Sequence, residues 1–103
     1  MVFELERAVK YRKALKFLAN NGFYSILSKA QQIEEVLENG SWLQPKIKSQ
    51  FKIEKLTGYK NYWKCKYIHS WRLVFTVDEN IITIIDLDRR NTIYNHLNLI
   101  FII

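Results

Sequence analysis

Hydrophobic residues recur at helical spacing in the N-terminal part of the chain. From Ala8 to Leu18 they repeat every three or four positions, and Asn20-Asn21-Gly22 then marks a helix end and a turn. A second run of the same spacing extends from Phe23 to Leu37 and ends at Asn39-Gly40. Two amphipathic helices joined by so short a turn predict an antiparallel helical hairpin.

The pattern changes to alternation in the middle of the chain. Two runs rich in aromatic and β-branched residues, Tyr62–Tyr67 and Trp71–Val77, are separated by a break at His69-Ser70. They predict two strands of an antiparallel hairpin, preceded by a turn at Gly58. The segment Ile81–Leu87 is apolar on both faces, as expected of a strand that has neighbours on both sides and is covered.

Three other segments carry weaker patterns. Val2–Leu5 alternates and predicts a short strand, and alternation between Phe51 and Leu56 predicts another strand before the Gly58 turn. Ser41–Gln50 contains Pro45 and is predicted to be a loop. The predicted fold is one α+β domain over residues 1–103, with the N-terminal helical hairpin packed on a twisted, mainly antiparallel sheet.

The C-terminal end is unusually apolar. Thr92–Asn98 is predicted as a short helix, and Leu99–Ile103 is a run of successive apolar residues. Such a β-prone run is an aggregation hazard if it stays exposed. We therefore expect it either to pack on the domain's own sheet or to form a surface for a partner.

Composition limits the class of protein. Hydrophobic residues make up 49% of the chain and charged residues 25%, which is enough to build a core. No apolar run approaches the roughly 18 to 20 residues needed to span a bilayer, so no membrane partner is expected. The single cysteine, Cys65, cannot form an internal disulfide, which suits a reducing cytoplasm, and its place on an apolar strand face predicts core packing.

Positive charge is concentrated in the middle of the chain. The net charge is +6, and residues 46–72 hold eight basic residues against the single acid Glu54. The basic residues are Lys46, Lys48, Lys52, Lys55, Lys60, Lys64, Lys66 and Arg72. Clustered cations bind polyanions by releasing condensed counterions, and the interleaved aromatic residues offer stacking partners for bases.

Alternation predicts where three of these cations lie. Lys64 and Lys66 share one face of their strand, while Trp63 lies on the other. In the next strand the side chains of Arg72 and Leu73 point to opposite faces. If the aromatic and aliphatic residues line the core, the three cations converge on the other surface and form a site for a phosphate chain.

The order of elements, together with four short motifs, resembles the RelE/ParE toxin superfamily. The motifs are Lys55–Gly58, Tyr62–Lys66, Trp71–Phe75 and Asp88–Tyr94. The superfamily consists of small basic proteins from bacterial and archaeal toxin–antitoxin pairs. The resemblance implies a RelE-like fold and a cognate antitoxin that covers or displaces the C-terminal element and shields the cationic face.

The RelE branch consists of ribosome-dependent endonucleases that cut messenger RNA in the ribosomal A site. The resemblance therefore implies the ribosome and its messenger RNA as partners, and no cofactor. The residues that match the catalytic pattern are Lys64, Lys66, Arg72, Tyr94 and either Arg89 or Arg90. Many relatives have a histidine where this chain has Asp88, so a histidine base is unavailable there; a related branch has a glutamate where Glu54 stands, which makes it a possible base.

RNA cleavage by its own 2′-hydroxyl needs a base, charge stabilisation on the phosphate and a proton for the departing 5′-oxygen. Repulsion between the two lysines is expected to lower the pKa of one, which favours Lys66 as base and Lys64 as phosphate clamp. Arg72 would grip the phosphate, Arg89 or Arg90 would stabilise the leaving oxygen, and Tyr94 would stack on a base or orient the 2′-hydroxyl. Additional RNA contacts are expected from Lys52, Lys55 and Lys60. No metal-ligand spacing is present, since His69 and His96 lie far apart.

Plain structural interpretations exist for the same residues. The lysines could simply face solvent, Arg72 could pair with Asp86 or Asp88, and Tyr94 could belong to the core. Two other functions also fit the fold: a ParE-like toxin that acts on DNA gyrase without cutting RNA, and a degenerate nucleic-acid-binding module. The retained catalytic pattern favours the endonuclease, whereas Asp88 lends weight to the degenerate module.

Overall fold

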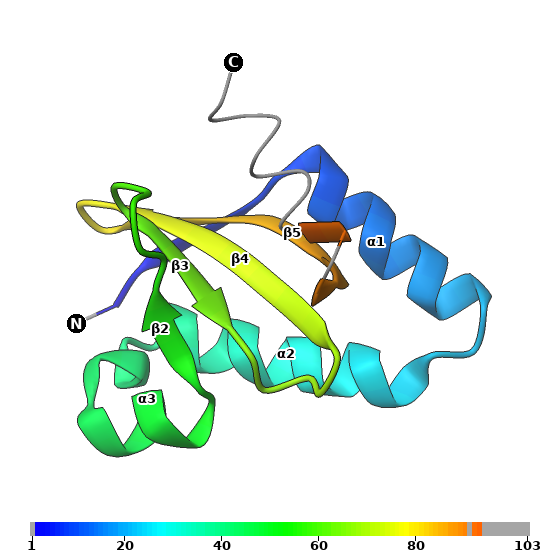
Figure 1. Cartoon of the computed structure of the whole chain (residues 1–103), viewed down its shortest axis with the longest axis horizontal. Coiled ribbons are helices and arrows are strands. Elements are labelled where there is room, and N and C mark those ends of the chain that lie inside the picture. The colour runs from blue at the N-terminus through cyan, green and yellow to red at the C-terminus, as the bar shows by residue number, and fades with distance from the viewer. Residues whose placement is uncertain (1, 91, 94–103) are drawn as a thin grey trace.

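The chain forms a five-stranded mixed sheet flanked by helices. The computed structural model describes residues 2–90, 92 and 93 (Figure 1). The strands lie in the order β1-β5-β4-β3-β2, and all neighbours are antiparallel except β1 and β5, which are parallel. The strands are β1 (Glu4–Arg7), β2 (Ile53–Lys55), β3 (Tyr62–Cys65), β4 (Trp71–Asp78) and β5 (Ile81–Arg89). The predicted α+β class and mainly antiparallel sheet are confirmed.

The two predicted N-terminal helices are present and form the expected hairpin. α1 (Val9–Asn20) packs beside β5, and α2 (Tyr24–Glu38) runs beneath the sheet (Figure 1). Each buries the apolar positions that recur at helical spacing, among them Tyr11, Leu18 and Ile33. Gly22 in the turn has a φ of 76°, a backbone conformation that glycine adopts without strain.

The prediction of a loop over Ser41–Gln50 is wrong. This segment forms a 3₁₀-helix at Ser41–Leu43 and the short helix α3 (Pro45–Gln50). Pro45 stands at the start of α3, where its missing N–H would be unpaired anyway and its fixed φ favours the helix. The proline therefore begins a helix, and Trp42 just before it is buried in the core.

Within residues 2–90, 92 and 93, the sheet has a thickly covered face and a lightly covered face. The main core lies against the helices and contains Cys65, Leu73 and Phe75, with Trp63 packed at its edge, as the alternation predicts. A much smaller apolar cluster lies on the other face. Its members are Leu56, Val74 and Ile93, with Tyr59, Tyr62 and Ile85 packed against them.

A bulge explains why β5 looked apolar on both faces. Val74 pairs with Asp86 and Phe75 pairs with Ile84, so Ile85 has no residue directly opposite it. The extra residue shifts the alternation, so that Ile84 belongs to the main core while Ile85 joins the small cluster. β5 is flanked by β1 and β4, which confirms the prediction of an inner strand.

The chain turns into a helical conformation after β5. Residues 90, 92 and 93 are helical, and Ile93 is buried against the lightly covered face. The rest of the helix predicted over Thr92–Asn98 and the apolar run Leu99–Ile103 lie outside the described residues, so both remain predictions. In the described part of the chain, no helix has the length and apolar character to span a bilayer.

Candidate nucleic-acid interface

The strand register places Lys64 and Arg72 on one face of the sheet. Lys64 lies opposite Val74 in β4 and opposite Glu54 in β2. Arg72 is two residues before Val74, so its side chain leaves the same face. The neighbouring pair Cys65 and Leu73 is fully buried on the other face, toward the helices. The shared face that alternation predicts is therefore observed.

Glu54 lies between the two lysines of this face. Its carboxylate oxygens are 2.9 Å from Lys66 Nζ and 3.7 Å from Lys64 Nζ. The hydrogen bond from Lys66, followed by the charges of both lysines, lowers the pKa of Glu54, and partial burial opposes this only in part. A carboxylate in this position offsets the repulsion between the lysines on which the expectation of a lysine base rested.

Backbone carbonyls orient the Arg72 side chain. Its Nη1 donates hydrogen bonds to the carbonyl oxygens of His69, at 2.5 Å, and Trp71, at 2.9 Å. Among the described residues no ion pair involves Arg72, and Asp86 pairs with Lys10 instead, at 3.7 Å. The structural alternative of an Arg72 pair with Asp86 or Asp88 is therefore not observed.

Arg72 also has a buried polar atom without a partner. Its Nε is inaccessible to solvent and makes no hydrogen bond within the described part of the chain. Buried donors without acceptors are uncommon in native proteins, and Trp42 Nε1 in the main core is a second one. Because Arg72 Nε is covered, contacts to a ligand would come from the Nη groups of this side chain.

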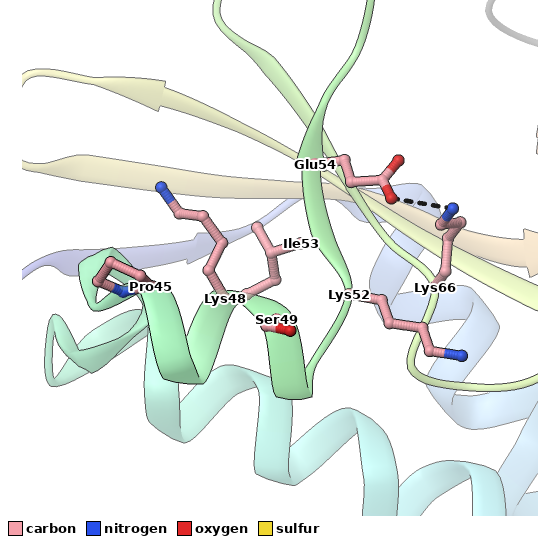
Figure 2. Close-up of a pocket in the computed structure, with 7 residues that line it drawn as sticks. All are labelled: Pro45, Lys48, Ser49, Lys52, Ile53, Glu54 and Lys66. Atoms are coloured by element: carbon pink, nitrogen blue, oxygen red, sulfur yellow. Dashed lines mark ion pairs between the residues drawn. The ribbon is translucent and has the colours of Figure 1, made fainter.

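Two adjoining hollows open beside these residues. The first has a volume of about 630 Å³ and is shown in Figure 2. It is lined by Pro45, Lys48, Ser49, Lys52, Ile53, Glu54 and Lys66. The second has a volume of about 410 Å³ and is lined by Lys29, Lys52, Lys66, Tyr67, His69 and Arg72. Lys52 and Lys66 line both hollows, so the two form one continuous cationic surface.

The backbone is strained at two residues of this surface. Lys52 has a φ of 53° and His69 a φ of 33°, values that residues with a side chain adopt rarely. Such conformations persist where the surrounding structure enforces them, and they concentrate at functional sites. Of the four non-glycine residues with positive φ in the described part of the chain, Lys52 and His69 line the hollows, and Asn61 and Glu79 lie in other turns.

The structure does not bring every predicted residue to this surface. Arg89 pairs with Trp71 in the register, and its guanidinium carbon lies 6.0 Å from the centre of the Trp71 ring. Because Trp71 packs against the main core, Arg89 lies on the side of the helices, away from Arg72. Arg90 is exposed and its backbone N–H donates a hydrogen bond to the carbonyl of Ser70, two residues before Arg72, and its role at this surface stays a prediction.

Three further predicted residues lie elsewhere or cannot be placed. Lys55 pairs with Trp63 across the strands, so its side chain points to the face of the sheet opposite to that of Glu54. It lines a separate hollow with Lys60 at the turn that contains Gly58. Tyr94 lies outside the described residues, and its role stays a prediction.

Sequence reasoning missed two cations of the surface. Lys29 comes from α2 and Lys48 from α3, both distant from the hairpin in sequence. Lys48 belongs to the basic stretch, but its segment was predicted to be a loop. In the structure it lies on α3, and its ammonium is 5.0 Å from the centre of the Trp63 ring. No local pattern marks Lys29, since the packing of α2 against the hairpin is what brings it there.

Across residues 2–90, 92 and 93, histidine, cysteine, aspartate and glutamate side chains form no group of three that could hold a metal ion. The chemistry available on this surface is therefore that of ammonium and guanidinium groups around one carboxylate. Such a set can bind phosphate groups and can accept a proton at Glu54.

Sequence comparison and structural comparison give different results for this chain. No protein-family model matches the sequence, and no curated protein matches it significantly. Solved structures do match. YafQ in the E. coli DinJ–YafQ toxin–antitoxin complex has a TM-score of 0.75 and 16% identity, with 91% of this chain and 99% of that chain covered.

Two other structures give the same result from different organisms. The YoeB dimer from Staphylococcus aureus has a TM-score of 0.69 and 21% identity, covering 87% of this chain and 99% of that chain. The RelE–RelB complex from Pyrococcus horikoshii OT3 has a TM-score of 0.64 and 19% identity, covering 87% and 97%. The chain has the RelE-like fold. That fold extends over nearly the whole chain, as the sequence resemblance implied.

Proposed function

We propose that this protein is the toxin of a toxin–antitoxin pair and acts as an endoribonuclease on messenger RNA bound to the ribosome. One observation carries the proposal: Lys66 and Arg72 meet at a hollowed surface with Lys52, and Glu54 lies beside Lys66. Cations around one carboxylate are what phosphodiester cleavage by a neighbouring 2′-hydroxyl requires. The likeness in fold to solved toxins supports the same function.

In this proposal the scissile phosphate binds where the two hollows meet. Lys66 lines both hollows and would contact one nonbridging oxygen. Arg72 would provide a second contact, because a guanidinium binds phosphate through paired N–H groups. Lys64 would add positive charge from the neighbouring position on β3. These cations would stabilise the extra negative charge that develops on the phosphate in the transition state.

Glu54 is the base in this mechanism. This differs from the sequence-based expectation, in which Lys66 is the base. Lys66 donates a hydrogen bond to Glu54 and so acts as a cation, whereas the lowered pKa of Glu54 keeps its carboxylate ionised at neutral pH. Glu54 would take the proton of the 2′-hydroxyl, whose oxygen then bonds to phosphorus. The bond from phosphorus to the 5′-oxygen breaks, leaving a 2′,3′-cyclic phosphate and a 5′-oxygen whose negative charge Arg90 would stabilise until water protonates it to the 5′-hydroxyl. Tyr94 would stack on a base or orient the 2′-hydroxyl.

Substrate binding would also prepare Glu54 for this step. A phosphate that contacts Lys66 competes with Glu54 for the same ammonium group. Losing that hydrogen bond would raise the pKa of Glu54, since the bond is the largest cause of its lowering. The base would therefore become stronger only when RNA is in place.

The proposed partners are the ribosome and an antitoxin. The exposed cationic surface supports binding to a polyanion such as ribosomal or messenger RNA. DinJ–YafQ and RelE–RelB were solved as complexes, which supports an antitoxin that binds this chain as well. Because the surface is cationic, we expect the antitoxin to cover it with acidic residues.

A cleavage assay on programmed ribosomes tests this function. The wild-type protein should cut messenger RNA at the A site, and Arg72→Ala should lower the rate by about 100-fold or more, in the range lost with one transition-state donor. Arg12→Ala removes an exposed arginine on α1 and is the matched control, with no expected effect. Absence of cutting by the folded wild-type protein would refute the nuclease, and inhibition of DNA gyrase would then support the ParE-like alternative.

A second candidate function is supported by Glu54 itself. Its ion pairs with both lysines neutralise part of the cationic surface, and Asp88 stands where many relatives have a histidine. Both features fit a protein that binds nucleic acid without cutting it. Tight binding to ribosomes or RNA with no cleavage product would favour this module over the nuclease.

A further inference from the structure

The second hollow differs in charge from the first. Four cationic side chains line it, those of Lys29, Lys52, Lys66 and Arg72, together with the Tyr67 ring and His69. The first hollow contains the carboxylate of Glu54, whereas no carboxylate lines the second. Like charges gathered in one hollow repel one another, and an anion bound among them would relieve this repulsion. The second hollow can therefore hold an anion.

Lys29 is the residue that distinguishes this hollow. It is half-buried on α2, and its ammonium lies 5.8 Å from the centre of the Tyr67 ring. Tyr67 is fixed in turn, because its hydroxyl donates a hydrogen bond of 2.8 Å to Gln32, one turn further along α2. Its ring also packs against Phe51, with 4.6 Å between centroids. The cation of Lys29 is thus held at the hollow by contacts between α2 and the β3–β4 hairpin.

We propose that the second hollow is a subsite for a second phosphate group of the RNA backbone, adjacent to the scissile phosphate, and that Lys29 is its positioning residue. The proposal rests on the proposed function for the nature of the polyanion. The two hollows share Lys52 and Lys66, so a strand whose scissile phosphate contacts Lys66 can place its neighbouring phosphate against Lys29 and Lys52. Lys52 and His69, which line this hollow, both have positive φ values that the surrounding structure enforces.

Short RNAs that cannot be cleaved measure the subsite directly. The probes are a dinucleotide with one phosphate and a trinucleotide with two, both of 2′-O-methyl uridine, titrated into the full-length protein and followed by NMR. For the wild type, the second phosphate should strengthen binding by about fivefold, as expected of one further charge-assisted contact. In Lys29→Ala this gain should disappear, while dinucleotide binding stays the same.

Salt dependence provides a second measurement on the same samples. Loss of one phosphate contact should reduce the slope of log K against log salt concentration by about 0.7 for the trinucleotide. Lys29→Arg keeps the charge and should keep both the gain and the slope. Lys16→Ala removes an exposed lysine of α1 that lines neither hollow and should change neither value.

The outcomes separate this inference from the proposed function. A wild type that binds the trinucleotide no tighter than the dinucleotide, or a folded Lys29→Ala that keeps the full gain, overturns the subsite. If such a protein still cuts messenger RNA on ribosomes, the proposed function stands without the subsite. If the gain depends on Lys29 but the protein cuts no RNA, the subsite stands and the nuclease is refuted.

Discussion

The carboxylate of Glu54 in β2 and the ammonium of Lys66, the residue after β3, form an ion pair of 2.9 Å (Figure 2). This pair joins the two groups to which we assign the base and the phosphate contact. In the proposed mechanism a phosphate that binds Lys66 competes with Glu54 for this ammonium group. The same contact would then oppose RNA binding and keep the proposed base ionised.

The first prediction is that Glu54→Gln separates binding from cleavage. Without the carboxylate, Lys66 is more available to phosphate, and binding of uncleavable RNA should strengthen by about two- to fivefold, the range expected of exposed ion pairs. Cleavage on ribosomes should fall by about 100-fold or more, because glutamine cannot accept the proton. The measurements are fluorescence polarisation and single-turnover cleavage.

The matched control for this pair of measurements is Glu35→Gln. Glu35 is exposed on α2 and lines neither hollow, so its removal tests the loss of one negative charge alone. Glu54→Gln protein that cuts RNA at the wild-type rate would exclude Glu54 as the base. Unchanged RNA affinity would instead show that Glu54 does not compete with phosphate.

The second prediction concerns the pH dependence of stability. The folded pKa of Glu54 is lowered from the ordinary value of 4.5, chiefly by the hydrogen bond from Lys66. Such a group stabilises the fold above its unfolded pKa, and the contribution is lost as the pH falls through the folded pKa. Wild type should exceed Glu54→Gln in stability at pH 7 by no more than about 1 kcal/mol, since the carboxylate is half exposed.

Thermal unfolding of both proteins across pH 3 to 7 checks this sign. The difference in melting temperature should shrink as the pH falls below about 4.5 and vanish once Glu54 is protonated in the folded state. A difference that stays constant over this range would mean that the substitution acts through packing rather than through the ion pair.

Local periodicity was sufficient for most of the fold. The helices α1 and α2 and the strands β3 and β4 are predicted by the spacing of their apolar residues, because each of them packs one face against the main core. α3 was missed because six residues are too few to show a helical period and Pro45 suggested a break. The parallel pairing of β1 with β5 depends on contacts between distant segments, which no local pattern contains.

The candidate site was predictable only where it lies on the hairpin. Lys64, Lys66 and Arg72 could be assigned to one face because side chains alternate along strands. The contribution of Lys29 could not, since it depends on how α2 packs beneath the sheet. Sequence likewise left Arg89 and Arg90 equivalent, and only the cation–π contact of Arg89 with Trp71 separates them.

The third prediction is that Cys65 is unreactive in the folded protein. Its thiol is fully buried and donates a hydrogen bond of 3.0 Å to the Phe51 carbonyl. Burial raises the pKa of this thiol to about 12, so at pH 8 only roughly one molecule in ten thousand would carry the thiolate. A chromogenic disulfide reagent should label the native protein extremely slowly and the urea-unfolded protein at once. Rapid labelling of native protein would contradict the buried position.

The last prediction concerns the network that joins the helical hairpin to the sheet. The Tyr11 hydroxyl of α1 donates a hydrogen bond of 2.6 Å to Glu34 of α2, and the guanidinium of Arg7 in β1 pairs with the same carboxylate. Burial, followed by this hydrogen bond, raises the pKa of Tyr11, so the hydroxyl stays neutral and remains a donor. Tyr11→Phe should lower the free energy of unfolding by about 1.5–3 kcal/mol, the cost of losing a hydrogen bond to a charged group.

Tyr24→Phe is the matched control: Tyr24 is 67% exposed, and its substitution should stay within about 0.5 kcal/mol of wild type in urea denaturation. Equal unfolding midpoints for the two variants would show that the Tyr11–Glu34 bond does not stabilise the fold. RNA affinity should be unchanged in both variants, because neither tyrosine lines a cationic hollow.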